Sequence, residues 1–213
     1  MARFGTNISL DDQTRVLDVG GYPWAWNGFR TSSKITILNV HSVDYPPQPG
    51  DVLFEYVVGD GTRLDYPDGA FDVVFSNSVI EHLGTIENQE AFARECRRVG
   101  RNLWIQTPAR SFFIEPHLLT PFIHFLPRSW QQLLLRNFTV WGLITRPSAN
   151  QVSDWMAEIR LLDRAEFSSL FPDCEILAER FLGMTKSYIA LRRTERPPVA
   201  RQMVEASDDR ALP

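Results

Sequence analysis

The sequence has little of several features that mark specialised classes of protein. Its 213 residues include only two cysteines, Cys96 and Cys174, whose separation fits neither a metal site nor a disulfide framework. It has no run of about 18 apolar residues, so a membrane-spanning helix is not expected. Residues 1–12 are polar and lack the apolar core of a secretory signal, which predicts a cytoplasmic protein.

An excess of basic residues is also missing. The chain has 22 Lys and Arg against 26 Asp and Glu, a net charge of −4. Binding to nucleic acid favours a basic balance, so that partner is not expected. The hydrophobic share of 44% is ordinary for a soluble globular protein, and the length suits one domain with an ample core.

What the sequence does contain is a series of short apolar runs that end in glycine, proline or polar residues. These runs predict strands over 15–19, 35–40, 52–58, 71–76 and 102–106. Phe92 and Cys96 share one face of a helix predicted over 88–99, and a shorter helix is expected over 24–31. Strands that alternate with helices predict a mostly parallel sheet with helices on both faces.

The carboxyl-terminal part shows a different pattern. A predicted helix over 164–171 precedes two strands, over 175–181 and 185–192, whose short separation predicts an antiparallel hairpin. Prolines and charges dominate after Arg193, so residues 194–213 are predicted to form a disordered tail. The folded domain is therefore expected to cover residues 1–193.

The segment over 108–153 is longer than a connection in a simple α/β sheet. Insertions of this length after a strand end are usually functional, and the aromatic and aliphatic content here suits a lid or the wall of an apolar substrate pocket. A pair of helices that covers the sheet is a compatible alternative. Arg128 and Arg136 add positive charge to its central part, which leaves peripheral contact with a membrane open.

Two stretches indicate a ligand site at the carboxyl ends of the strands, where open α/β sheets bind ligands. The first stretch, Val16-Leu17-Asp18-Val19-Gly20-Gly21, is the end of a strand with an acidic residue, followed by two glycines. Because glycine has no Cβ, a ligand can approach the backbone closely there. The second contains Val57-Val58-Gly59-Asp60-Gly61, a Pro/Gly turn, a strand, and Ser76-Asn77-Ser78-Val79-Ile80-Glu81-His82-Leu83. Together they resemble the class I S-adenosylmethionine-dependent methyltransferases, within them the group that acts on small molecules.

This resemblance implies an α/β, Rossmann-like, open and mostly parallel seven-stranded sheet with an antiparallel C-terminal hairpin. It implies S-adenosylmethionine as the cofactor, with Asp18 and the glycines beside its methionine part and Asp60 accepting a hydrogen bond from the adenine. Asn39 stands where the family usually places an acid for the ribose hydroxyls. The cofactor-binding residues implied are Asp18, Gly20, Gly21, Asn39, Asp60, Gly61 and Asn77.

The acceptor needs a base only if it must lose a proton, and histidine suits that role because its pKa lies near neutrality. His82 follows the fourth predicted strand, and His117 follows the fifth, where the insertion begins. Both are candidates for catalysis or substrate contact, with a structural role as the alternative. Together with Glu81 and Glu115 they show no spacing typical of metal ligands, so no metal is expected.

Two other functions compete with methyl transfer. A nicotinamide oxidoreductase would need Gly-x-Gly-x-x-Gly after the first strand, and the sequence from Gly20 to Ala25 lacks it. A catalytically silent, methyltransferase-like binding or scaffold protein stays open, because the bulky Tyr22–Trp26 stretch and the neutral Asn39 depart from the family pattern. We predict methyl transfer to a small-molecule or lipid-like acceptor held under the insertion.

Overall fold

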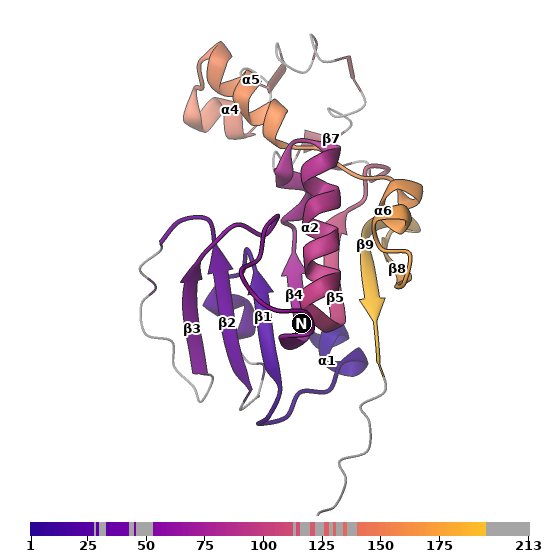
Figure 1. Ribbon diagram of the computed structural model, residues 1–213. Helices are drawn as coiled ribbons and strands as arrows, with labels where there is room; N and C mark the ends of the chain where they lie inside the picture. Colours follow the sequence, from indigo (N-terminus) through magenta and orange to yellow (C-terminus); the bar gives the residue numbers. More distant parts are fainter. Residues whose placement is uncertain are drawn as a thin grey trace, which may run out of the picture.

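A single seven-stranded sheet organises the chain (Figure 1). The computed structural model describes residues 1–27, 29, 33–42, 45, 53–112, 114–115, 120–121, 126–127, 130, 134–135 and 140–194. The sheet has the order β3-β2-β1-β4-β5-β9-β8. Its strands are β1 (Arg15–Val19), β2 (Lys34–Asn39), β3 (Leu53–Val58), β4 (Phe71–Asn77), β5 (Gly100–Pro108), β8 (Glu175–Phe181) and β9 (Met184–Arg192).

The pairing of the strands confirms the predicted fold class. β1 to β5 run parallel to one another, and β9 is antiparallel to both β5 and β8. The central strands are buried on both faces, as their continuous apolar runs require. In β1, Val16 and Leu17 are both fully buried but belong to two different core clusters, one on each face.

Helices cover the two faces of this sheet. α2 (Ile86–Val99) begins at Thr85, whose hydroxyl accepts the Asn88 N–H, and it buries Phe92 and Cys96 as predicted. α6 (Arg164–Leu170) packs beside it and begins with a capping box formed by Asp163 and Glu166.

The opposite face is covered by two elements that the sequence analysis placed poorly. α1 (Ala2–Asn7) was not predicted, because Phe4 is its only fully buried anchor in a polar stretch. The helix expected over 24–31 is a single 3₁₀ turn, η1 (Pro23–Trp26). Its Trp26 packs edge-on against Phe4. Tertiary packing of one large ring therefore fixes this short segment.

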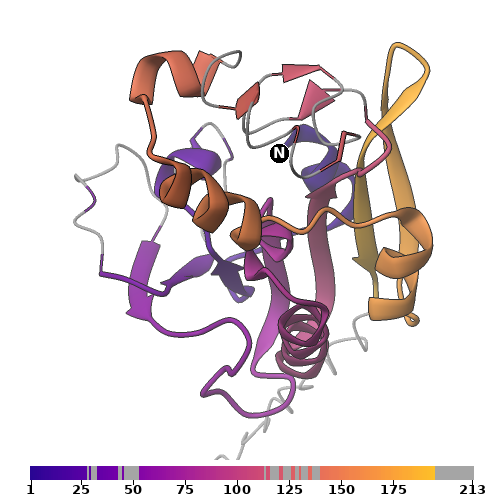
Figure 2. The ribbon, with the colours of Figure 1, turned by 90° about the horizontal axis from the view of Figure 1, so that it is seen from above.

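The insertion lies above the carboxyl ends of the parallel strands (Figures 1 and 2). Its described elements are β6 (Ile114–Glu115), β7 (Thr120–Pro121), α4 (Val140–Thr145) and α5 (Ala149–Glu158). α5 buries Val152 and Met156 against Leu135. The chain returns to the end of β5 at Leu162, which bridges to Ala109.

Two further predictions concern the C-terminal tail and membrane-spanning helices. Apart from Thr194, the predicted tail lies outside the described residues. No helix within the described ranges combines the length and apolar character needed to cross a membrane.

Candidate functional site

The ends of the first four strands are tied together by hydrogen bonds. The Gly20 N–H donates to the Leu38 carbonyl (2.8 Å), and the Gly59 N–H donates to the Asn39 carbonyl (2.9 Å). The Ser76 hydroxyl at the end of β4 donates to the carbonyl of Val19 (2.9 Å). All the predicted cofactor-binding residues therefore lie along one edge of the sheet.

The turn after β1 has room only for glycine. Gly20 has φ +73°, and a Cβ built there would lie 2.5 Å from Cγ2 of Val79. A Cβ on Gly21 would lie 1.9 Å from Oδ2 of Asp18. The two glycines thus let the backbone fold tightly over a buried carboxylate, with a conformation that L side chains disfavour at the first of them.

Asp18 is a fully buried acid with one unsatisfied oxygen. Its Oδ2 accepts the indole N–H of Trp26 at 2.8 Å. Its Oδ1 is buried and has no hydrogen-bond partner in the described part of the chain. Burial raises the pKa of Asp18 to about 7, and the bond from Trp26 opposes that rise. A buried acceptor without a donor is costly, so this position suits a ligand that brings an N–H or a positive charge.

The large rings that follow Gly21 divide into two groups. Trp26 is part of the core, where it lies 5.2 Å from the Phe75 ring, and its indole holds Asp18. Trp24 is 65% exposed and stacks on Tyr22 with ring centroids 5.9 Å apart. The role of Trp26 was missed in the sequence, although an indole donor close after a buried acid was an available signal.

Asn39 links the ends of β1 and β2. Its Nδ2 donates to the Gly21 carbonyl and to the Tyr45 hydroxyl, both at 3.0 Å. Burial, with nearby Tyr22 and Tyr56, raises the pKa of Tyr45, so its hydroxyl stays protonated at neutral pH. The Tyr45 hydroxyl in turn donates to the Gly21 carbonyl at a long 3.5 Å. The side-chain oxygen Oδ1 of Asn39 is an acceptor, and the Tyr45 hydroxyl is a donor that a ligand could draw away from Gly21. Tyr45 was missed because it stands in a proline-rich loop without periodicity.

The end of β3 is more open. Asp60 is exposed, and its Oδ1 accepts both the N–H and the hydroxyl of Thr62 at 2.8 Å, which closes a turn. Gly61 is buried, and a Cβ there would lie 2.9 Å from Cγ1 of Val19 and 3.0 Å from the Phe92 ring. The turn that carries Asp60 therefore packs directly onto the core.

Of the two predicted catalytic histidines, the structure describes His82, which lies near Asn77, a predicted cofactor-binding residue. Asn77 is exposed at the end of β4, and His82 is exposed on η2 (Ile80–Leu83) at the same edge of the sheet. His117 lies outside the described residues. Glu81, beside His82, is fully buried and accepts the Thr107 hydroxyl at 3.0 Å. No cluster of three acidic, histidine or cysteine side chains suited to a metal occurs in the described ranges.

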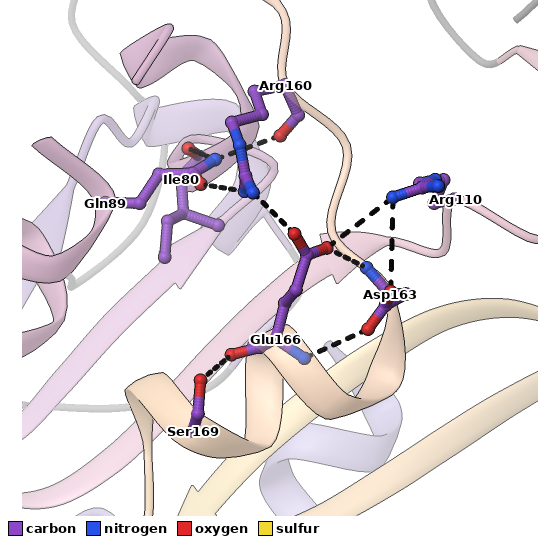
Figure 3. A network of polar contacts seen from close by, with 7 residues as sticks. All are labelled: Ile80, Gln89, Arg110, Arg160, Asp163, Glu166 and Ser169. Atoms are coloured by element: carbon purple, nitrogen blue, oxygen red, sulfur yellow. Dashed lines mark hydrogen bonds and ion pairs between the residues drawn. The ribbon is translucent and has the colours of Figure 1, made fainter. Parts of the chain in front are cut away.

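A polar network fixes η2 to the segment that returns from the insertion (Figure 3). The Arg160 guanidinium donates to Gln89 of α2 and to Glu166 of α6. Gln89 in turn donates to the Ile80 carbonyl at 2.9 Å, and the Arg160 N–H donates to the Glu81 carbonyl at 2.7 Å. The backbone that carries His82 is thus held from two sides.

The fold and these glycine-ended strand tips are those of a Rossmann-like α/β protein, a fold in which ligands bind at the carboxyl ends of the strands. Residues 35–102 match the family model described as a methyltransferase domain. This match covers about a third of the chain, so that this segment is similar to a methyltransferase domain, in agreement with the resemblance noted in the sequence.

Individual proteins resemble the chain in sequence or in fold. A 2-methyl-6-phytyl-1,4-hydroquinone methyltransferase from Synechocystis sp. is 34% identical over 112 residues, which cover 46% of this chain. The chain spans only 32% of the length of that relative. A S-adenosylmethionine-dependent methyltransferase from Methanosarcina mazei has a TM-score of 0.51 at 13% identity, covering 90% of this chain and 95% of its own.

A protein from Rhodobacter sphaeroides, described as a zinc-dependent alcohol dehydrogenase, has a similar fold. Its TM-score is 0.53 at 13% identity, with 89% of this chain and 86% of that chain covered. At such identities the structures show a shared fold, and the activity has to be argued from the site.

Proposed function

We propose that the chain transfers a methyl group from S-adenosylmethionine to a small-molecule or lipid-like acceptor. The observation that carries this proposal is the buried Asp18, whose Oδ1 lacks a donor beside the Gly20-Gly21 turn. The cofactor has an amino-acid part with a positive ammonium group, which is a fitting donor for such an oxygen. The methyltransferase-domain match over residues 35–102 supports the same assignment.

The other strand ends would hold the rest of the cofactor. Asn39 and Tyr45 are suited to the ribose hydroxyls, because the pair provides an acceptor and a donor side by side. Asp60 retains Oδ2 for the adenine amino group while its Oδ1 closes the turn with Thr62. Bound S-adenosylmethionine supplies a methyl group that its sulfonium already activates, so these residues mainly bind and orient it.

The acceptor is proposed to lie between the strand ends and the insertion. α4 and α5 stand above this edge, and the insertion is rich in apolar residues. The name of the Synechocystis relative describes a hydroquinone with a phytyl chain, which agrees with a lipid-like acceptor bearing a hydroxyl. His82 and His117 remain the candidate bases that would take the proton from such a hydroxyl. We also propose a cytoplasmic location.

The proposal is tested by offering the purified chain S-adenosylmethionine with hydroquinones that carry or lack a prenyl tail. Formation of S-adenosylhomocysteine is measured, and the prenylated acceptors are expected to react faster. The His117→Ala variant is expected to lower turnover while the affinity for S-adenosylmethionine is kept. Cofactor binding without turnover on any acceptor would favour a catalytically silent binding protein instead.

A further inference from the structure

The β8–β9 hairpin ends in an unusual turn. Phe181 pairs with Met184 across the strands, and Leu182 and Gly183 form the two-residue loop between them. Both loop residues have positive φ, 49° at Leu182 and 81° at Gly183, as in a type I′ turn. Asn or Gly normally occupies the first of these positions, because a positive φ is unfavourable for a bulky side chain.

The fold itself provides no reason for a leucine here. Leu182 is 80% exposed, so no core packing compensates for its backbone conformation. Its neighbours Phe181 and Met184 are 51% and 41% exposed. Three large apolar side chains are therefore exposed to solvent, wholly or in part, at the tip of one hairpin.

Positive charges border this tip on both strands. Arg180 precedes Phe181, Lys186 follows Met184 by two residues, and both side chains are exposed. Neither forms an ion pair with any residue in the described part of the chain, whereas Arg192 and Arg193 at the far end of the same hairpin both do. The tip thus combines an apolar end with unpaired cations just behind it.

We propose that this hairpin tip, Phe181 to Met184, docks into the surface of an anionic lipid bilayer. Apolar side chains would enter the boundary of the acyl chains while Arg180 and Lys186 meet the phosphate layer. Figure 2 shows the β8–β9 hairpin projecting as a finger, and the Phe112–Phe181 ring contact (6.3 Å) places its tip beside the start of the insertion. Docking would therefore bring the insertion close to the membrane.

The size of the patch favours lipid over a protein partner. A stable protein interface buries about 800 Å² on each side, which is far more than three side chains at a finger tip can offer. A bilayer accepts such a narrow apolar tip, since it needs no matching surface. The inference does not depend on methyl transfer, although it would give a lipid-like acceptor a direct route to the site.

The test measures sedimentation of the full chain with phosphatidylcholine vesicles, with and without phosphatidylglycerol. The wild-type chain is expected to bind the anionic vesicles preferentially. Leu182→Asn is expected to weaken binding by about tenfold, because it removes one inserted apolar side chain. Each of Arg180→Gln and Lys186→Gln is expected to cost about fivefold on anionic vesicles only.

Leu182→Asn is an informative variant because asparagine suits the turn. Its melting temperature should equal or exceed that of the wild type, so weaker binding would not reflect unfolding. The matched control is Leu53→Asn on β3 at the other edge of the sheet, where the leucine is 66% exposed; its vesicle binding should not change.

Three results would overturn the proposal: no wild-type binding to anionic vesicles, equal binding to neutral and anionic vesicles, or wild-type binding by Leu182→Asn. S-adenosylmethionine affinity, measured on the same samples by calorimetry, keeps this test separate from the proposed enzyme function. A chain that binds the cofactor but not the vesicles contradicts only the membrane proposal.

Discussion

The ends of β1 and β3 each carry an aspartate, and the two sites differ in almost every physical respect. Asp18 is fully buried, is held by an indole N–H, and keeps one oxygen without a partner in the described chain. Asp60 is exposed and closes its own turn with Thr62. A buried, poorly satisfied charge affects stability, pH response and binding together, whereas an exposed one contributes mainly a single contact. We therefore expect larger effects from changes at the β1 end.

The largest effect is expected from Gly21→Ala. The added Cβ would lie 1.9 Å from Oδ2 of Asp18, so either the turn or the carboxylate must move. We expect S-adenosylmethionine affinity to fall by more than about a hundredfold and the free energy of unfolding to fall by about 1–3 kcal/mol. Calorimetry and urea denaturation measure the two quantities.

Gly183→Ala is the control, because it replaces a glycine by alanine in the β8–β9 turn, outside the proposed cofactor site. No atom lies within 4 Å of a Cβ built at Gly183, although its φ of +81° makes alanine unfavourable there. Its cofactor affinity should equal that of the wild type. Unchanged affinity in Gly21→Ala would show that the β1 turn does not border the ligand.

Asp18→Asn is expected to change how stability depends on pH. The pKa of Asp18 is raised by burial from 3.8 to about 7, so between these values the folded protein holds a proton that the unfolded chain has lost. Wild-type stability therefore falls as the pH rises through this window and levels off above pH 7. The variant has no such loss, and at pH 8 it should be more stable than the wild type by about 2–4 kcal/mol.

Denaturant titrations of both proteins at pH 4.5 and pH 8 provide the measurement. Asparagine can still accept the Trp26 indole N–H through its side-chain oxygen, so the two proteins should have similar stability at the lower pH. If the difference in free energy of unfolding between the variant and the wild type were the same at pH 4.5 and pH 8, the buried, pKa-shifted state of Asp18 would be contradicted.

Asp60→Ala is expected to weaken S-adenosylmethionine binding by about tenfold, the value of one charge-assisted hydrogen bond at an exposed position. This change also removes the acceptor for Thr62, which closes the turn. Asp60→Asn keeps one oxygen for Thr62 and separates the two roles. Equal losses in both variants indicate a contact with the cofactor, and a loss confined to the alanine variant indicates a role in the turn alone.

The smallest effect is expected from Tyr45→Phe, with a two- to tenfold loss of cofactor affinity for one neutral hydrogen bond. Tyr56→Phe is the matched control, because the two rings lie 4.9 Å apart and the Tyr56 hydroxyl has no hydrogen-bond partner in the described chain. An analogue of S-adenosylhomocysteine without its ribose hydroxyls should bind the wild type and the Tyr45→Phe variant with equal affinity. If Tyr45→Phe still bound that analogue more weakly than the wild type, the proposal that Tyr45 contacts the ribose hydroxyls would be contradicted.

The sequence was most informative where one local pattern decided the structure. The bounds of β1 and β8 were predicted as observed, because alternating or continuous apolar residues end there on glycine or leucine-glycine turns. Asn39 was also placed correctly at the end of β2. Backbone periodicity and turn residues are local properties, so they can be read without knowledge of the fold.

Features that depend on tertiary contacts were missed. Trp26 belongs to the bulky stretch that departs from the family pattern, and its place in the core, where it donates to Asp18, is not marked by any periodicity in the sequence. Tyr45 reaches the site from a proline-rich loop through a hydrogen bond to Asn39, and no periodicity marks it. α1 depends on Phe4, one ring that contacts Trp26 and Trp104. These residues act through partners that are distant in the sequence.

Calorimetric titration of the purified chain with S-adenosylmethionine tests the central claim most directly. If the ends of β1, β2 and β3 form one cofactor site around Asp18, the titration gives saturable binding of one molecule per chain, and Gly21→Ala abolishes it. Absence of heat and of any thermal shift at millimolar cofactor, or binding that Gly21→Ala leaves unchanged, would contradict the account.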